Sequence, residues 1–363
     1  MLADLQRSTY RLAIGAATML SLPLRARDHR IAVFYGGAYA GDVGGPLVKV
    51  AMLGARFPER RLGFSLVYVL SNAIYLPQFV LDAVRRADVP VVLNQNGVFY
   101  PSWYPNGWER ENARMAAVHA AAVHVLYQSE FCRRTAERFL GRRSGPSEIL
   151  YNGVDTERFC PAVAEPRRGP FTFLMSGKIV QSTRYRLASG IEGIASARQS
   201  GLDVRLVIAG YVDPIVAADA RTLAAQRGVA DAVQLTGHYR HADAPSLYCS
   251  ADAYLMTKHN DPCPNGVLEA LACGLPVLYS ASGGVPELVG EEAGVALTVP
   301  DTFDETPVPD PMAMVEGMAR VIAYRDSMAR AARVRAVERF HVSAWLDRHE
   351  ALFEGLLAKR PVR

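Results

Sequence analysis

Two carboxylates, Asp261 and Glu269, lie eight residues apart in the chain. Asn265 and the apolar residues after it predict a helix start, with Asn265 as the N-cap. The acid of a capping box would lie three residues further on, where the chain has Leu268. Glu269 is therefore free of a capping role. With Asp261 it could accept strong hydrogen bonds from paired sugar hydroxyls, although two surface acids on a loop and a helix would give the same pattern.

Two glycine turns beside these acids could bind an anion through bare backbone. Gly266 removes a side chain where a ligand could approach the helix, and the N–H groups of a helix start favour phosphate. A second turn, Ser282-Gly283-Gly284, follows a predicted strand and could form an anion nest. Two helix starts at consecutive strand ends favour a phosphate site over two unrelated tight turns.

Two cations follow the first predicted strand of the second half of the chain. Lys178 and Arg184 lie six residues apart, and together they could neutralise a pyrophosphate leaving group. Either of them alone would more often be a solvated charge. Near the start of the chain, Gly44 and Gly45 open a helix that includes Lys49. The spacing there is not GxGxxG, which disfavours a dinucleotide site.

Amides end the third predicted strand, where Asn94 and Asn96 precede the aromatic segment 99–104. Amides with aromatic rings suit a polar, ring-shaped ligand. The same aromatics could equally pack the edge of a domain, and both interpretations stay open.

The elements that position these residues alternate along the chain. Strand-like apolar runs occur at 31–35, 64–70, 89–93, 122–127, 148–151, 171–175, 204–208, 232–236, 253–256, 277–279 and 295–298. Helical patterns occur at 46–57, 76–87, 109–121, 130–140 and 343–357. Buried strands separated by helices predict α/β domains with parallel sheets, and the crossover rule favours doubly wound topology. We therefore expect two Rossmann-like domains facing a central cleft, where such sheets bind ligands.

The domain boundary is predicted from a segment without hydrophobic period. Residues 161–170 are rich in proline and glycine and predict a linker. We expect an N-terminal domain over 1–160 and a C-terminal domain over 171–341. The helix expected over 342–358 is amphipathic.

Composition excludes several classes of protein. The chain is half apolar and has a net charge of +4, which does not argue for nucleic acid but is compatible with an anionic ligand. Its five cysteines show no CxxC spacing, so neither a disulfide framework nor a zinc site is expected, and a reducing compartment is favoured. The histidines show no metal-ligand spacing.

The N-terminus combines basic and apolar residues. Arg7 and Arg11 precede an apolar run at 13–24, and Arg25 follows it. The run is too short to span a bilayer, and basic residues stand where a signal-peptide cleavage site would be expected. A packed or membrane-surface helix is favoured, so we expect a cytoplasmic protein in which residues 1–30 could contact the inner membrane face.

Several segments, in order, resemble the retaining glycosyltransferases of family 4, which have the GT-B fold. The block from Asp261 to Glu287 is the most specific, with Glu-Ala-Leu-Ala-Cys-Gly-Leu-Pro-Val followed by Gly-Gly-Val-Pro-Glu. Supporting segments are Gly44-Gly45, Tyr151-Asn-Gly-Val-Asp-Thr-Glu-Arg-Phe159, Ser176-Gly-Lys178 and the closing helix around Trp345. The resemblance extends over most of the chain from about residue 31.

The resemblance implies a nucleotide-sugar donor held mainly by the C-terminal domain. Glu269 would bind the ribose hydroxyls, Asp261 the transferred sugar, and Lys178 with Arg184 the phosphates. Backbone of the following residues would complete the phosphate cradle: Gly44, Gly45, Asn265, Gly266, Val267, Leu268, Ser282, Gly283 and Gly284. The closing helix would cross back onto the N-terminal domain. The acceptor would be a saccharide, a lipid-linked sugar or a small molecule.

Four positions depart from the family pattern. The family usually has glutamate where this chain has Asp261, and arginine before lysine where it has Lys178 and Arg184. An active-site histidine is often found where this chain has Asn96, which we include among the candidate catalytic residues. Because cations and helix N-termini supply the positive charge, no metal or other cofactor is expected. Retention would require the acceptor to attack the face of the sugar from which the phosphate departs. An epimerase of similar fold and a non-catalytic sugar-nucleotide-binding protein are the alternatives.

Overall fold

The computed structural model describes residues 2–26, 28–41, 45–162 and 169–359. The chain forms two compact units. Unit 1 comprises the residues up to 100, residues 104–151 and the residues from 343 onward. Unit 2 comprises residues 101–103 and 152–342. Each unit is built on one parallel sheet, as the alternating pattern predicts.

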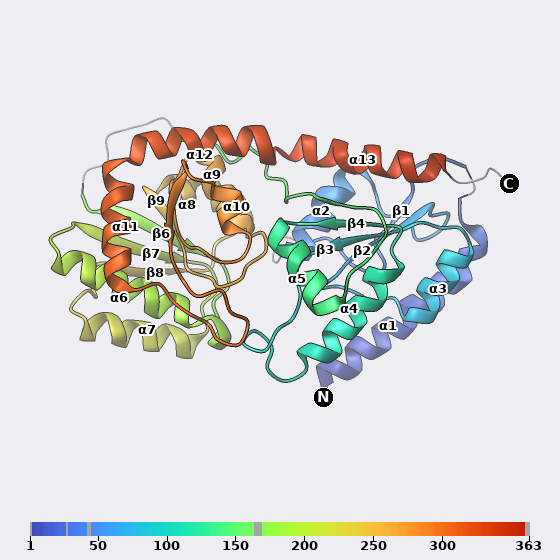
Figure 1. Ribbon diagram of the computed structural model, residues 1–363, viewed down its shortest axis with the longest axis horizontal. Helices are drawn as coiled ribbons and strands as arrows, with labels where there is room; N and C mark the ends of the chain where they lie inside the picture. Colours follow the sequence, from blue (N-terminus) through green and yellow to red (C-terminus); the bar gives the residue numbers. More distant parts are fainter. Residues whose placement is uncertain (1, 27, 42–44, 163–168, 360–363) are drawn as a thin grey trace. The chain divides into compact units, whose positions relative to one another are not determined.

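The sheet of unit 1 has five strands in sequential order. They are β1 (Val33–Phe34), β2 (Leu66–Leu70), β3 (Val91–Gln95), β4 (His124–Tyr127) and β5 (Ser147–Ile149). Its helices are α1 (Leu2–Ser21), the short η1 (Leu22–Leu24), α2 (Gly45–Arg56), α3 (Gln78–Arg86), α4 (Trp108–Ala121), α5 (Glu130–Leu140) and α13 (Val342–Ala358). In Figure 1, α2 and α13 lie on one side of this sheet, and α1, α3 and α4 lie on the other.

Alternation along β2 explains how both faces are covered. Val67 and Val69 belong to the apolar core that includes side chains of α1, α3 and α4. Tyr68 lies between them and points to the opposite face, where its hydroxyl is 3.0 Å from Nε2 of His349 on α13. Its ring packs edge-on against Phe353. The C-terminal helix therefore completes the core of unit 1.

The sheet of unit 2 has six strands in the order β11-β10-β9-β6-β7-β8. The strands are β6 (Phe171–Ser176), β7 (Val204–Ala209), β8 (Val233–Gly237), β9 (Ala253–Met256), β10 (Val277–Ser280) and β11 (Gly294–Leu297). The strand order reverses between β6 and β9, so this sheet is doubly wound. Ligands of such sheets bind beyond the carboxyl ends of the strands at this reversal.

Helices cover both faces of the second sheet (Figure 1). They are η2 (Gln181–Thr183), α6 (Tyr185–Gln199), α7 (Pro214–Gln226), η3 (His241–Asp243), α8 (Ala244–Cys249), α9 (Asn265–Ala272), α10 (Val285–Val289), α11 (Pro311–Ala323) and α12 (Arg325–Phe340). The observed bounds differ from the expected ones by at most two residues at most element ends, which is the usual uncertainty at fraying ends.

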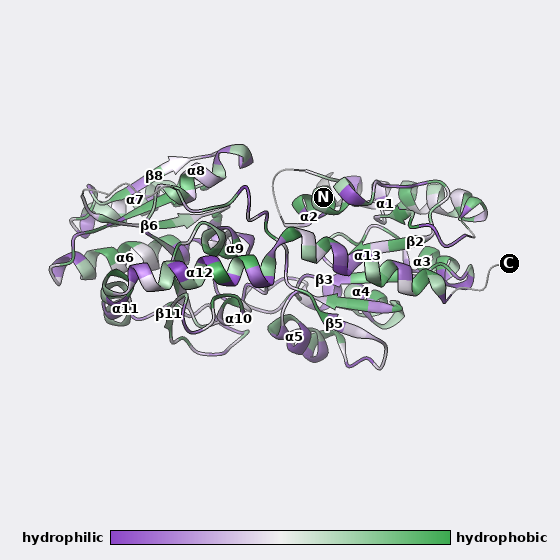
Figure 2. Cartoon of the chain, turned by 90° about the horizontal axis from the view of Figure 1, so that it is seen from above, coloured by the Kyte–Doolittle hydropathy of each residue, from purple (hydrophilic) through white to green (hydrophobic). Residues whose placement is uncertain are grey.

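The first helix, α1, has one buried and one exposed apolar face. Ile14 and Leu22 pack into the core of unit 1. The exposed apolar side chains of α1 and η1 are Leu12, Met19, Leu20 and Leu24. Figure 2 shows the hydropathy of this helix. No helix among the described residues is long and apolar enough to cross a membrane.

Candidate functional site

A buried hydroxyl network lies beneath Glu269 at the strand reversal of unit 2. Tyr248 on α8 donates a 2.8 Å hydrogen bond to Oε2 of Glu269 on α9. The hydroxyl of Ser176, the last residue of β6, lies 3.0 Å from the phenols of both Tyr248 and Tyr254. One carboxylate oxygen of Glu269 is therefore fixed from below. The side chain keeps 16% of its surface exposed, so part of it can meet a ligand.

Burial controls the protonation of Glu269. Desolvation raises the pKa of this carboxyl to about 7, against the opposing effects of the Tyr248 hydrogen bond and the charge of Arg158. Nε2 of His241 lies 3.9 Å from Oε1 of Glu269. The carboxyl can therefore change charge near neutral pH, and a ligand that donates hydrogen bonds would favour its ionised form.

Gly266 is required by the same network. A Cβ at this position would lie 2.6 Å from the hydroxyl of Tyr254 and 3.2 Å from that of Tyr248. The expectation that its missing side chain makes room for a ligand is therefore wrong on this face of the residue, since tyrosine hydroxyls occupy the space. Among the described residues no acceptor is found for the N–H of Gly266, so this group remains available to an anion.

Asn265 does not act as the N-cap that the sequence predicts. It is the first residue of α9, the cap position is Pro264, and no side chain caps the helix. The amide oxygen of Asn265 instead accepts a 2.9 Å hydrogen bond from Asn152. The N–H groups of Val267 and Leu268 bond to the carbonyl of Pro264 at 3.0 and 3.5 Å. Glu269 lies beyond the capping-box position of the helix whether the cap is Asn265 or Pro264.

Asp261 has intramolecular partners on both oxygens. Oδ2 accepts a 2.8 Å hydrogen bond from Nζ of Lys258, and Oδ1 accepts one of 3.2 Å from the N–H of Cys263. Nζ of Lys258 also lies 5.4 Å from the ring centroid of Trp103. The predicted contact of Asp261 with a sugar stays a prediction, and it would have to share these oxygens with Lys258 and Cys263.

In the nest predicted at Ser282, Gly283 and Gly284, two of the three N–H groups already bond to carbonyls of the protein. The N–H of Ser282 bonds to the carbonyl of Ser280 at 2.7 Å, and that of Gly284 bonds to the carbonyl of Asp261 at 2.9 Å. Gly283 has φ of +67°, and a Cβ there would lie 2.3 Å from the carbonyl oxygen of Asp261. A three-amide nest is therefore not formed, because the carbonyls of Ser280 and Asp261 each use one of its donors.

The predicted cations lie beyond the carboxyl end of β6. Two glycines fix this loop, since a Cβ on Gly210 would lie 2.3 Å from the carbonyl oxygen of Gly177. Lys178 is exposed, and its Nζ lies 5.7 Å from the ring centroid of Tyr211. Arg184 is exposed at the N-cap of α6, a helix of 15 residues with no acid in its first turn. Positive charge therefore gathers at this strand end.

Asn96 belongs to a polar cluster in unit 1. Lys49, 4% exposed, donates to the amide oxygens of Asn94 at 2.7 Å and Asn96 at 3.1 Å. Gln128 donates to the same oxygen of Asn96. Because lysine can only donate, the oxygen of Asn96 must face Lys49, and its NH₂ group points away, toward Asn72. Asn96 can thus offer a ligand a donor.

The remaining predicted site residues of unit 1 are the paired glycines Gly44 and Gly45. Gly45 is the first residue of this helix, and a Cβ there would meet open space. Gly44 lies outside the described residues. All other predicted site residues except Asn96 belong to unit 2.

Sequence reasoning did not single out Tyr248, Tyr254, Lys258 or Arg186. The tyrosines lie in segments that predict ordinary core packing, and only their distance in space from Glu269 reveals their role. Lys258 could have been noticed as one of four lysines, three residues before Asp261. Arg186 is buried in the first turn of α6, where the sequence offers no acid as a partner.

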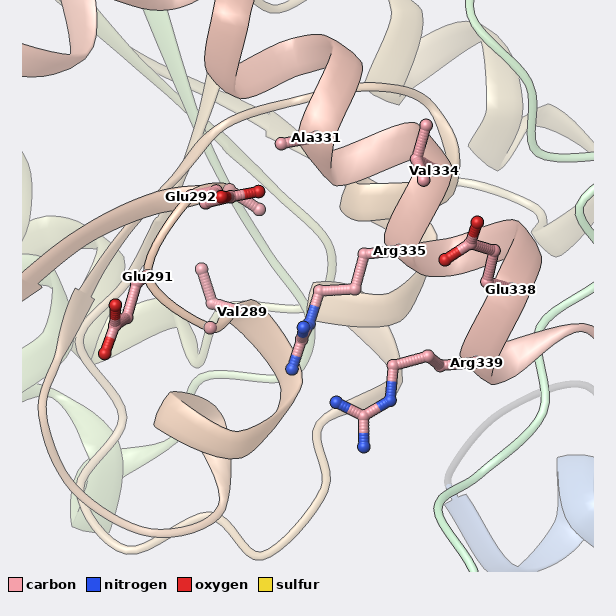
Figure 3. A pocket seen from close by; sticks show the side chains of 10 residues that line it. Val289, Glu291, Glu292, Ala331, Val334, Arg335, Glu338 and Arg339 are labelled. Carbon is pink, nitrogen blue, oxygen red and sulfur yellow. The ribbon is translucent and has the colours of Figure 1, made fainter.

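A pocket of about 440 Å³ lies elsewhere in unit 2, at the end of α10 (Figure 3). Arg335 on α12 donates to the carbonyl of Glu287 at 2.7 Å on its edge. None of the predicted site residues lines this pocket. Within the described part of the chain, no three His, Cys, Asp or Glu side chains are grouped so that they could hold a metal ion.

Two family models match the chain. Residues 170–323 match the model described as Glycosyl transferases group 1, and residues 19–158 match the model described as Glycosyltransferase Family 4. The two matches together span most of both units. The chain belongs to this family of glycosyltransferases, which confirms the resemblance.

Similar proteins agree with this assignment. The chain is 27% identical to glycogen synthase of Mycobacterium tuberculosis over 231 residues, which are 61% of this chain and 52% of that protein. It therefore spans about half the length of this relative. Sucrose-phosphate synthase from Thermosynechococcus elongatus superposes with a TM-score of 0.65 at 20% identity, covering 81% of this chain and 74% of that one. Anabaena Alr3699/HepE in complex with UDP superposes with a TM-score of 0.63 at 17% identity, covering 86% and 82%. The predicted GT-B fold is confirmed.

Proposed function

We propose that this protein transfers a sugar, with retention of anomeric configuration, from a nucleotide-sugar donor to an acceptor hydroxyl. The observation that supports this most directly is Glu269, which is partly exposed, has one oxygen fixed by Tyr248, and is linked through Tyr248 to Ser176 at the strand end that precedes Lys178 and Arg184. A carboxylate held in this way binds hydroxyls, and the cations bind phosphate. A nucleoside diphosphate contains both groups.

In this proposal, different residues of unit 2 bind different parts of the donor. Glu269 accepts hydrogen bonds from the ribose hydroxyls. Lys178, Arg184 and the N–H groups of Gly266 and Gly283 bind the diphosphate. Asp261 contacts the transferred sugar when its oxygens are shared with Lys258. Asn96 of unit 1 is a candidate donor of a hydrogen bond to substrate.

The reaction would proceed on one face of the sugar. The bond between the anomeric carbon and the phosphate oxygen breaks, the acceptor oxygen bonds to the same face, and its proton passes to the departing phosphate. Lys178 and Arg184 would stabilise the charge that develops on that phosphate. With these cations we propose that no metal or other cofactor is required.

The identity of the base and sugar is a matter for screening. Structures of Anabaena Alr3699/HepE have been solved with UDP, with UDP and glucose, and with UDP-glucose, so UDP-sugars are the first donors to test. The acceptor is proposed to be a saccharide, a lipid-linked sugar or a small molecule. A cytoplasmic enzyme that contacts the inner membrane face through residues 1–30 is also proposed, and the exposed apolar side chains of α1 and η1 support the membrane contact.

A donor screen tests the proposal. Thermal shift with a panel of UDP-, GDP- and ADP-sugars should reveal one donor class that raises the melting temperature by mass action. That donor should then be consumed only when an acceptor extract is added. Conversion of the donor alone would indicate an epimerase, and binding without any turnover would indicate a non-catalytic binding protein. No stabilisation by any nucleotide sugar would refute the proposal.

A further inference from the structure

Arg186 is a deeply buried arginine with few partners. Its residue is 4% exposed, and it lies in the first turn of α6, two residues after Arg184. Nη2 donates a 3.2 Å hydrogen bond to the carbonyl of Ser176, at the carboxyl end of β6. Nε is buried and has no hydrogen-bond partner among the described residues.

No carboxylate of the described chain pairs with this guanidinium. Asp261 is paired with Lys258. Glu269 owes its raised pKa to burial, with Tyr248 and Arg158 as the opposing influences. Burial raises the pKa of Tyr254, while the charge of Arg186 lowers it and that of Glu269 raises it, so both groups act on this ring. The cation is therefore left without a counter-ion in the empty protein.

Another arginine of unit 2, Arg333, has the hydrogen-bond partners expected of a guanidinium that stabilises the fold. Nη1 of Arg333, which is only partly buried, donates to the carbonyls of Thr156, Phe159 and Ala272, each at 2.9 Å. Arg186 is more deeply buried and has a single carbonyl. Burying a charge without a partner is costly, and the positive end of a helix dipole adds to that cost. Such a charge is favourable only when an anion binds next to it.

We propose that Arg186 is a third cation of the donor site, whose guanidinium pairs with the diphosphate together with Lys178 and Arg184. The inference rests on the proposed function. Residues two apart on a helix face different sides, so Arg184 approaches the N-terminus of α6 from solvent and Arg186 from the sheet. The diphosphate would lie over the Ser176 strand end, where both guanidinium groups and the helix N–H groups can reach it.

The test compares the stability of the empty protein with its affinity for phosphate. Arg186→Met removes the charge and keeps an apolar side chain of similar length. Arg186→Gln also removes the charge but keeps an N–H donor for the Ser176 carbonyl. Arg333→Met is the matched control for an arginine that pairs with carbonyls. Titration calorimetry uses inorganic pyrophosphate, UDP, GDP, ADP and the free nucleosides uridine, guanosine and adenosine.

We expect both Arg186 variants to melt at or above the wild-type temperature when empty, because an uncompensated charge is gone. Affinity for pyrophosphate should fall by at least about tenfold, as should affinity for whichever diphosphate the wild type binds, while that of the matching nucleoside should not change. Arg333→Met should show the opposite pattern, with a lower melting temperature and unchanged affinity.

Three results would overturn the inference. One is pyrophosphate affinity within twofold of wild type in folded Arg186→Gln. Another is a melting temperature of the empty Arg186→Met protein that falls as far as that of Arg333→Met. The third is a failure of both Arg186 variants to fold, since the guanidinium would then stabilise the empty protein. If the wild type binds pyrophosphate but none of UDP, GDP and ADP, the proposed donor class fails while Arg186 is still tested.

Discussion

The phenol of Tyr248 donates a 2.8 Å hydrogen bond to Oε2 of Glu269, and it does so from a fully buried ring. When Glu269 is ionised, Tyr248 gives its one proton to that carboxylate, so its bond to Ser176 must be accepted from the serine hydroxyl. Ser176 then has no proton left for Tyr254, which must donate to it. The hydroxyl groups of Ser176 and Tyr254 thereby orient the phenol of Tyr248, which holds Glu269.

Tyr248→Phe should weaken donor binding and shift its pH dependence. The phenol lowers the pKa of Glu269, so its loss should raise that pKa further. The acidic limb of kcat/KM against pH should move to higher pH, and the protein should lose about 1 kcal/mol of stability. Tyr324→Phe, at an exposed ring, is the control. An unchanged acidic limb in Tyr248→Phe would contradict the assigned bond.

Glu269→Gln should remove one contribution to the pH dependence of stability between about 4.5 and 7. The pKa of Glu269 is raised from 4.5 to about 7, so in this window its carboxyl keeps a proton in the folded protein that it has lost in the unfolded chain. The contribution of Glu269 to wild-type stability therefore falls as pH rises through the window. At pH 8 the glutamine variant should be more stable by on the order of 1–3 kcal/mol, and near pH 4 the difference should vanish. Urea unfolding at several pH values measures this, and parallel curves for both proteins would contradict it.

Lys178→Ala and Arg184→Ala should each remove most turnover while the fold survives. Both side chains are exposed, so melting temperatures should stay within about 2 °C of wild type. The loss should fall mainly on kcat, because the phosphate charge grows as the glycosidic bond breaks. Arg221→Ala on the exposed side of α7 serves as the control. Wild-type rates in both site variants would refute the phosphate assignment.

Gly266→Ala should destabilise the protein through the tyrosine network. Its Cβ would lie 2.6 Å from the hydroxyl of Tyr254, and overpacking of this kind costs about 1–3 kcal/mol. Adding Tyr254→Phe removes the clashing oxygen and should recover part of the loss. A double-mutant cycle measured by thermal unfolding gives the coupling. Additive effects of the two substitutions would show that the close approach is absent.

Much of the fold is predictable from the sequence, and the reasons are local. Helix 130–140 is found at its expected bounds, because Ser129 caps it and an apolar period continues to Gly141. Strands β6, β9 and β10 of unit 2 are buried almost throughout and appear as continuous apolar runs, whereas the edge strand β8 has no buried residue. The position of Glu269 on a helix follows from the same reading, although the start of that helix is set by Pro264 rather than by an Asn265 cap.

The contacts around the candidate site are harder to predict from the sequence than the fold is. Tyr248 lies 21 residues before Glu269, and no local pattern indicates that the two meet. Asp261 reads as an exposed acid, but Lys258 and the N–H of Cys263 already bond to it. The glycines at 266 and 283 suggest room for a ligand, whereas a phenol and a carbonyl approach them. These contacts depend on how strands and loops meet in space, which spacing along the chain does not encode.

The C-terminal helix has a consequence for biosynthesis. His349 and Phe353 of α13 pack on Tyr68 in the sheet of unit 1, yet they leave the ribosome after every residue of unit 2. Domains synthesised first usually fold first. Here the part of the first sheet that α13 covers must stay exposed until the later unit has been translated. A released chain truncated before residue 343 should therefore contain a folded second unit and a first unit that chaperones still recognise.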